Sequence, residues 1–220
     1  NVNLNSSEIE DQGLIHLSEA LQVNRSLTHV DLQGELASSG QANVHLCRAL
    51  ADNCSLVHVC LRGHNFDNQG VEHLAEALRV NSTITRIDLV NNKLGGRCKL
   101  LCEALAVNFT INFIDLTNNL IIDTDCQFLS QTMRLNNSIT SINISENKIE
   151  GPGMCSLFSA LQANFTLTRL AISAKQSYSK IEGLQQLAQS ITANHVLNRV
   201  YLSVSTAEGE KDLQLLQIDH

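Results

Sequence analysis

Residues 81–96 read NSTITRIDLVNNKLGG, a short stretch of alternating apolar and polar side chains framed by asparagines. Ile87 and Leu89 alternate with Arg86 and Asp88, which is the spacing of a β-strand. Nearly the same phrase returns as NFTINFIDLTNNLI at 108–121 and as NNSITSINISENKI at 136–149. A phrase that recurs at near-constant spacing indicates a repeat architecture.

The repeat continues along the chain in both directions. Aligned copies of the phrase begin at Asn24, Asn53, Asn81, Asn108, Asn136, Asn164 and Asn194, in steps of 27 to 30 residues. A shortened copy stands at 2–5, and residues 213–218 (LQLLQI) resemble a last strand. No linker or change of composition interrupts the pattern. We therefore predict one domain over residues 1–220, with about eight strand–helix units and a C-terminal capping segment at 203–220.

The second half of each unit is helical. Val71, Leu74, Ala75 and Leu78 lie at i, i+3, i+4 and i+7, and so share one face of a helix. Neither this helix nor a strand with three apolar positions can bury itself, but stacked units share a continuous core. Strands stack more closely than helices, so the stack must curve. The sequence predicts an α/β solenoid, a right-handed horseshoe with a parallel sheet on the concave face and helices on the convex face.

The strand phrase resembles the leucine-rich repeat, L-x-x-L-x-L-x-x-N-x-L. It stands here as ITRIDLVNNKL (84–94), INFIDLTNNLI (111–121) and ITSINISENKI (139–149). The unit length near 28 residues and the helical second half are similar to the ribonuclease-inhibitor-like class, which includes the sensor domains of NOD-like receptors and several bacterial effectors. The resemblance implies a noncatalytic scaffold that binds a protein partner through its concave face.

The resemblance also implies a ladder of hydrogen-bonded asparagines in the turns after the strands. This sequence keeps the ladder asparagine as Asn92, Asn119 and Asn147. It replaces the asparagine with Glu35, His64, Lys175 and Ser205. We expect looser and wetter turns at these four positions.

The asparagine that opens each phrase, here called the junction asparagine, follows the helix and precedes the strand. We interpret it as structural, because asparagine tolerates the left-handed conformation of helix ends and its amide can satisfy free backbone groups. The alternative is glycosylation, since six of the seven stand in N-x-[ST] sequons. The sequons share one repeat position, so the repeat explains them without a glycan.

Composition narrows the compartment and the partners. The formal charge of −7 argues against nonspecific nucleic-acid binding. No apolar run is long enough to insert into a membrane. Seven cysteines without a CxxC pair favour a reducing compartment, and we expect Cys98 and Cys102 to be free, packed thiols. The expected location is cytoplasmic, or the host cytoplasm for a bacterial effector. We expect a monomer or a fragment of a larger protein.

Catalytic and metal-binding patterns are weak in this sequence. It contains no P-loop, G-x-G-x-x-G, H-E-x-x-H or nucleophile elbow. His29 and His58 with Cys60 could bind zinc, but no spacing motif supports such a site, and we interpret them as exposed polar side chains of the concave face. His16, His45 and His73 recur on successive helices, too far apart to share one ion. We predict no enzyme activity, no cofactor and no metal.

Strand alternation assigns three columns of side chains to the concave face. The expected partner-binding residues are His58, Arg86, Asp88, Phe113, Asp115, Arg169 and Tyr201. Exposed aromatic and arginine side chains are enriched at interface hot spots, which places the centre near Phe113. The alternative is that pairs such as Arg86 and Asp88 offset each other's charge and keep this face soluble, while a convex or terminal surface binds the partner. The partner is a protein that the sequence does not identify.

Two other functions remain open at this point. One is a GTPase activator similar to the activator of Ran, for which Arg62 and Asn91 stand in loops after strands. The other is an actin-binding domain similar to tropomodulin. Both use the same scaffold, because a fold does not by itself determine a function.

Overall fold

The structure is a computed structural model that describes residues 1–4, 9–33, 40–175, 180–206 and 209–217. Its strands form one nine-stranded sheet in sequence order. They are β1 (Val2–Asn3), β2 (His29–Asp31), β3 (His58–Cys60), β4 (Arg86–Asp88), β5 (Phe113–Asp115), β6 (Ser141–Ile144), β7 (Arg169–Lys175), β8 (Arg199–Thr206) and β9 (Gly209–Gln217). The first eight are parallel, and β9 is antiparallel to β8.

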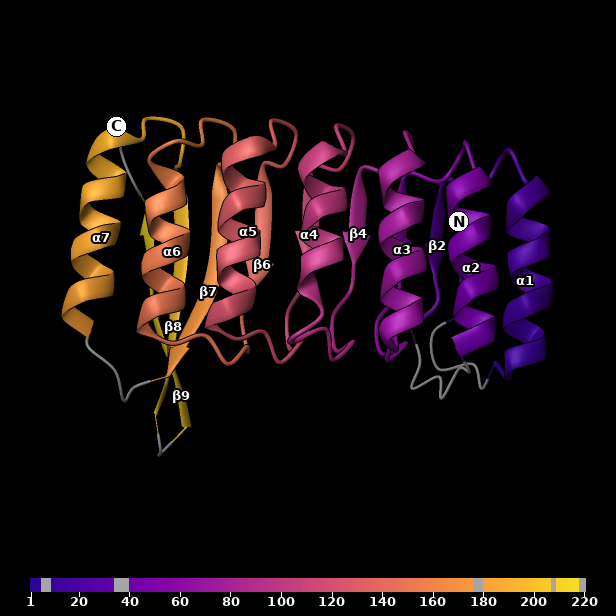
Figure 1. The fold of residues 1–220 in the computed structure, drawn as a ribbon, viewed down its shortest axis with the longest axis horizontal. Helices are drawn as coiled ribbons and strands as arrows, with labels where there is room; N and C mark the ends of the chain where they lie inside the picture. The colour runs from indigo at the N-terminus through magenta and orange to yellow at the C-terminus, as the bar shows by residue number, and fades with distance from the viewer. Residues whose placement is uncertain (5–8, 34–39, 176–179, 207–208, 218–220) are drawn as a thin grey trace.

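Seven helices alternate with these strands. They are α1 (Asp11–Val23), α2 (Gly40–Asp52), α3 (Asn68–Val80), α4 (Cys98–Val107), α5 (Asp123–Leu135), α6 (Gly151–Leu161) and α7 (Lys180–Ala193). Figure 1 shows them side by side in one layer that covers a single face of the sheet. The predicted α/β solenoid is confirmed. The predicted last strand exists as β9, which begins earlier than expected, while Ile218 lies outside the described residues.

The core lies between the sheet and the helix layer. Equivalent strand positions contribute Ile87, Ile114 and Ile142, all nearly or fully buried. Helix residues such as Leu78 and Leu105 meet them from the other side. Because strands are spaced about 4.8 Å apart and helices about 8–10 Å apart, the sheet is the inner face of the stack.

The junction asparagines tie each unit to the one before it. Asn136 Nδ2 donates to the carbonyl of Leu105 (2.8 Å) and to the carbonyl of Asn108 (2.7 Å). Its Oδ1 accepts from the backbone N–H groups of Ser138 (2.8 Å) and Ile139 (2.7 Å). Asn53, Asn81, Asn108 and Asn194 make the same set of bonds.

One part of the prediction for these asparagines is wrong. They do not take up the left-handed conformation, because Asn24, Asn81, Asn108 and Asn136 have φ between −67° and −81° and extended ψ. The chain leaves each helix directly in the extended conformation of the coming strand. These positions therefore require an asparagine for its side-chain amide and not for a special backbone conformation.

The second asparagine ladder is present in the turns after the strands. The backbone N–H of Asn92 donates to Asn119 Oδ1, and that of Asn119 donates to Asn147 Oδ1, both at 2.9 Å. Their Nδ2 atoms donate backwards to the carbonyls of Leu61, Leu89 and Leu116. The resemblance therefore describes the central turns correctly.

His64 corrects the expectation of a loose turn. It is fully buried, and its Nε2 lies 3.1 Å from the carbonyl of Leu32, which is the bond that a ladder asparagine makes to the preceding unit. Its ring also stacks on Phe66, with 5.7 Å between the ring centroids. The turn at His64 is thus dry and packed. Glu35 lies outside the described residues, as do the side chains of Lys175 and Ser205.

Candidate protein-binding surface on the open sheet face

The sheet face opposite the helices carries one column of side chains that we call the third-position column. The strand register aligns His29, His58, Arg86, Phe113, Ser141, Arg169 and Arg199 across seven strands. Alternation turns all of them away from the core. The column is rich in cations, although the whole chain carries a net negative charge.

The centre of this column is an arginine stacked on an aromatic ring. The guanidinium carbon of Arg86 lies 3.5 Å from the centroid of the Phe113 ring. Arg86 is exposed and Phe113 is half-buried. A cation over a ring at an exposed site is worth about 0.5–1 kcal/mol, so the stack holds both side chains in place. A flat platform with a positive charge therefore stands in the middle of the face.

The neighbouring column has a structural task that the sequence did not reveal. Asp31, Asp88, Asp115 and Asn143 each accept, through Oδ1, the backbone N–H two residues further on. Such a side-chain bond closes the turn that ends the strand. The aspartates expected to contact a partner are thus engaged in the fold, although Asp115 remains half-buried and partly accessible.

Asp88 lies differently from the expectation. It is 3% exposed, and its Oδ2 accepts from Arg62 Nε at 2.8 Å and Nη2 at 2.6 Å. The pKa of Arg62 is raised, first by its hydrogen bond to Asp88. Arg86 therefore pairs with the Phe113 ring, and Asp88 pairs with Arg62. This bond also holds the arginine that was considered as a GTPase-activating residue.

Asn91, the other residue considered for GTPase activation, has a structural role. Its backbone φ is 59°, a left-handed turn conformation that asparagine tolerates. Its Oδ1 lies 3.4 Å from Nδ2 of Asn118, the equivalent residue of the next unit.

The histidines at the N-terminal end of the column contact each other. The rings of His29 and His58 meet edge to face, with 5.6 Å between centroids. Burial lowers the pKa of His58, and the positive charge of Arg86 lowers it further. Cys60 is buried, which raises its pKa to about 12 and leaves the thiol protonated. Within the described part of the chain, no cluster of three metal-binding side chains occurs.

The C-terminal end of the column brings Arg169 and Arg199 together. They are register partners on β7 and β8, and both are exposed. Tyr201 follows two residues after Arg199 and is 40% exposed. The β8–β9 register is irregular between Val200 and Leu202, at the position of this tyrosine.

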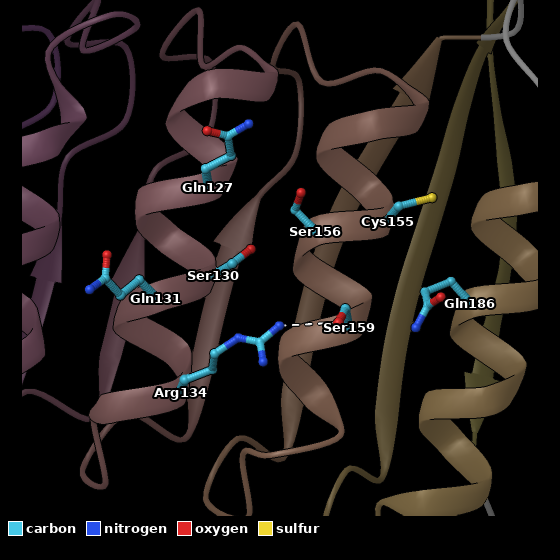
Figure 2. A pocket seen from close by; sticks show the side chains of 8 residues that line it. All are labelled: Gln127, Ser130, Gln131, Arg134, Cys155, Ser156, Ser159 and Gln186. Atoms are coloured by element: carbon cyan, nitrogen blue, oxygen red, sulfur yellow. Dashed lines mark hydrogen bonds between the residues drawn. The ribbon is translucent and has the colours of Figure 1, made fainter.

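The helix layer holds a polar groove that sequence reasoning missed. It is open to solvent, has a volume of about 630 Å³ and is lined by Gln127, Ser130, Gln131, Arg134, Cys155, Ser156, Ser159 and Gln186. Figure 2 shows these side chains on α5, α6 and α7, with Arg134 Nη2 donating to Ser159 Oγ at 3.1 Å. The buried hydroxyl of Ser130 has no hydrogen-bond partner among the residues that the structure describes. Small polar residues on the facing sides of two neighbouring helices were the available signal.

A second groove of about 390 Å³ lies between α4 and α5. Its lining includes the apolar side chains of Val107 and Leu135, each at the C-terminal end of its helix. Phe109 stands just beyond α4 and is 79% exposed. Val107 and Phe109 flank the junction asparagine Asn108, and Leu135 precedes the junction asparagine Asn136. The repeat thus places such apolar side chains next to the junction asparagines, at the edge of the stack.

The chain contains no membrane-spanning helix among its described residues, since none is both long and apolar enough. All seven cysteines are free thiols, and Cys98 and Cys102 are buried, as expected. Burial raises the pKa of Cys47 and of Cys102 to about 12. These thiols act as packing groups and not as nucleophiles.

Comparisons with known proteins agree with the fold. A family model described as "Leucine Rich repeat" matches residues 135–158. The sequence matches no curated protein. Among solved structures, Leiomodin-1 Actin-Binding Site 2 is similar, with 21% identity, a TM-score of 0.50, and coverage of 60% of this chain and 78% of that one.

The C-terminal domain of tropomodulin from Caenorhabditis elegans is similar as well. The identity is 14% and the TM-score 0.56, over 71% of this chain and 93% of that chain. At such identities the likeness concerns the fold alone. The repeated phrase, the single-sheet solenoid with its asparagine ladders and the family match over residues 135–158 together show a leucine-rich repeat fold.

Proposed function

We propose that this chain is a noncatalytic scaffold that binds a protein partner through its open sheet face. The observation that carries the proposal is the Arg86–Phe113 platform, which stands in the middle of a face that no helix covers. Aromatic and arginine side chains in such positions are typical of interface hot spots. The fold supports this function, since a concave repeat surface is well suited to a protein partner.

A binding experiment with two matched phenylalanine variants tests the placement. The purified chain serves as bait, and quantitative mass spectrometry compares the proteins captured by wild type, Phe113→Ala and Phe109→Ala. Phe109 is an equally large and more exposed ring at the edge of the stack. We expect Phe113→Ala to lose the partners that wild type and Phe109→Ala retain. Loss with Phe109→Ala alone would move the binding surface to the edge.

A second candidate is actin binding of the tropomodulin type. The two similar structures are an actin-binding site of leiomodin-1 and a tropomodulin domain, which supports this candidate at the level of fold. Co-sedimentation with actin filaments and a pyrene-actin polymerisation assay test it. If the chain at micromolar concentration neither co-sediments with actin filaments nor changes the polymerisation rate, actin binding is ruled out. The general scaffold proposal is not affected by that result.

The proposed compartment is the cytoplasm. The junction asparagines at sequons are mostly buried, and Nδ2 of Asn136, the atom that would carry a glycan, donates two hydrogen bonds. Free thiols that pack as apolar groups also suit a reducing compartment. Enzymatic deglycosylation of the chain expressed in its own cells should leave its mass unchanged, whereas a loss of mass would place it in the secretory pathway.

A further inference from the structure

We propose that the open sheet face binds an acidic segment of a protein partner in extended conformation. Its carboxylates would meet Arg86 at one point and the register partners Arg169 and Arg199, here called the arginine pair, at another. The inference rests on the proposed function and adds the chemical class of the partner and the spacing of its charges.

The arginine pair is an unbalanced feature of the apo fold. Arg169 and Arg199 are Cα partners on neighbouring strands, about 4.8 Å apart, and both side chains are exposed. Like charges directly opposite each other destabilise a sheet. Within the part of the chain that the structure describes, neither arginine forms an ion pair. A bound anion would remove this repulsion.

Among the residues that the structure describes, the strand register places no charged side chain beside the arginine pair. The register places Ser141 next to Arg169 and Gln217 next to Arg199. Two residues further along the strands stand Ala171 and Tyr201. No acidic residue of the described ranges lies beside the pair in the register, and both arginine side chains are exposed.

Arg86 is also available to bind a carboxylate of the partner. Asp88, the acid closest to it in sequence on this face, is occupied by Arg62, and the guanidinium of Arg86 is held over Phe113. Burial first, and then the charge of Arg86, lowers the pKa of His58 on the neighbouring strand, against the opposing charges of Asp88 and Asp31. The platform thus presents a fixed cation that forms no ion pair within the described part of the chain.

The distance between the two points defines the spacing of the ligand. From β4 to β7 are three strand steps, or roughly 14 Å. An extended segment advances about 3.3 Å per residue, so this span corresponds to about four residues. Residues i, i+2 and i+4 of such a segment face the same way. The ligand is therefore an acid–x–apolar–x–acid segment that crosses the strands, with its apolar residue above Phe113 and Ser141.

The adjacent column restricts the ligand to few charges. Asp31 and Asp115 keep their carboxylates beside the third-position column, and the chain as a whole is acidic. A continuous polyanion such as nucleic acid would be repelled by them. Two separated carboxylates that lie on the arginines avoid this repulsion.

Fluorescence polarisation with short blocked peptides tests the inference on the full chain. The probe is SESLSES, and the matched control is SEELSSS, which has the same composition with adjacent acids. Protein variants are Arg86→Gln, Arg199→Gln and, as a control on the exposed surface of α2, Arg48→Gln. We expect SESLSES to bind about tenfold more tightly than SEELSSS, and Arg86→Gln and Arg199→Gln each to weaken it about tenfold, as for one lost ion pair.

Two further readouts separate the outcomes. Arg199→Gln should unfold in urea at an equal or higher concentration than wild type, because it removes like-charge repulsion; a clear loss of stability would assign Arg199 to the fold and overturn the inference. Equal binding of both peptides, or binding only of a version with phosphoserine in place of Glu, would overturn it as well. Such a failure leaves the scaffold proposal standing if Phe113→Ala still loses its captured partners.

Discussion

The junction asparagines join the repeats one side chain at a time. In Asn136, as in Asn53, Asn81, Asn108 and Asn194, the amide donates to the preceding unit and accepts from its own strand, so it satisfies four backbone groups where a helix becomes a strand. No other side chain offers two donors and an acceptor in this geometry. The repeated asparagine is therefore required by hydrogen-bond satisfaction.

We expect Asn136→Ala to lower the free energy of unfolding by about 3–5 kcal/mol. The substitution leaves buried carbonyl and N–H groups without partners, at about 1–3 kcal/mol each, with partial relief by water. Urea unfolding followed by circular dichroism measures the change. Asn137→Ala is the control, because that neighbouring side chain is exposed. Similar losses for the two variants would contradict the role of the junction amide.

His64 makes the stability of the fold depend on pH. Burial lowers its pKa from 6.5 to about 4, so the unfolded chain takes up a proton between these values while the folded chain does not. Stability therefore falls as the pH decreases from about 6.5 toward 4, by roughly 2 kcal/mol at pH 5.

His64→Asn should remove this dependence. Asparagine can donate to the carbonyl of Leu32 as the ladder asparagines do, and it does not titrate. Urea unfolding at pH 7 and pH 5 measures the loss of stability on acidification, which we expect to be smaller in the variant by roughly 2 kcal/mol. An unchanged difference between the two pH values would show that other groups cause the acid sensitivity.

At the scale of elements, each strand-to-helix turn must accommodate the turn of the next unit. A Cβ on Gly95 would overlap the backbone carbonyl of Leu120 in the adjacent turn, and the Gly95 N–H donates to the carbonyl of Asn119 at 2.7 Å. Gly96 has a φ of +74° and open space around it. The two neighbouring glycines are thus needed for different reasons.

Gly95→Ala should destabilise the fold more than Gly96→Ala. The first introduces a clash with backbone that cannot turn aside, which costs about 3 kcal/mol. The second adds only left-handed strain of about 1–2 kcal/mol. Thermal and urea unfolding of the two variants provide the comparison. A larger loss for Gly96→Ala would mean that backbone conformation, and not contact between units, limits the turn.

Sequence periodicity predicted the helices and strands well, because every unit repeats the same pattern. An incorrect assignment would have had to fit all the units at once. The strands at His58–Cys60 and Arg86–Asp88 and the helix around Leu74 follow from spacing alone. Spacing does not report which polar partner a side chain chooses. For this reason it could not show that Asp88 turns toward Arg62 and closes a turn, or that Arg86 lies over Phe113. The groove at Ser130 depends on how two neighbouring helices face each other. That orientation cannot be read from the spacing of residues in a single sequence.

At the scale of the whole molecule, the main contacts join neighbours in the stack. Each helix packs on the next helix, and each strand bonds the next strand. The stability of such a stack is approximately the sum of the stability of each unit and of each interface between neighbouring units. A substitution that weakens one unit therefore acts mainly on that unit and its neighbours.

Hydrogen exchange should show this locality. In Asn136→Ala we expect the largest increase in amide exchange in β5 and β6, the strands of the units that Asn136 joins, and the smallest in β2. Mass spectrometry of peptic fragments at neutral pH resolves these regions. An equal increase in all strands would indicate that the stack opens as one cooperative body.

The direction of the junction bonds has a consequence for how the chain can change in length. Every described Nδ2 bond of this kind runs from one unit back to the one before it. Each of these boundaries therefore presents the same backbone carbonyl acceptors to the unit that follows. Removing residues 109–136 would join Asn108 to the strand that now follows Asn136, with the amide still in place. A gene that loses or duplicates one such module would yield a shorter or longer arc of the same curvature, and the extent of the concave face could evolve without any change in its chemistry.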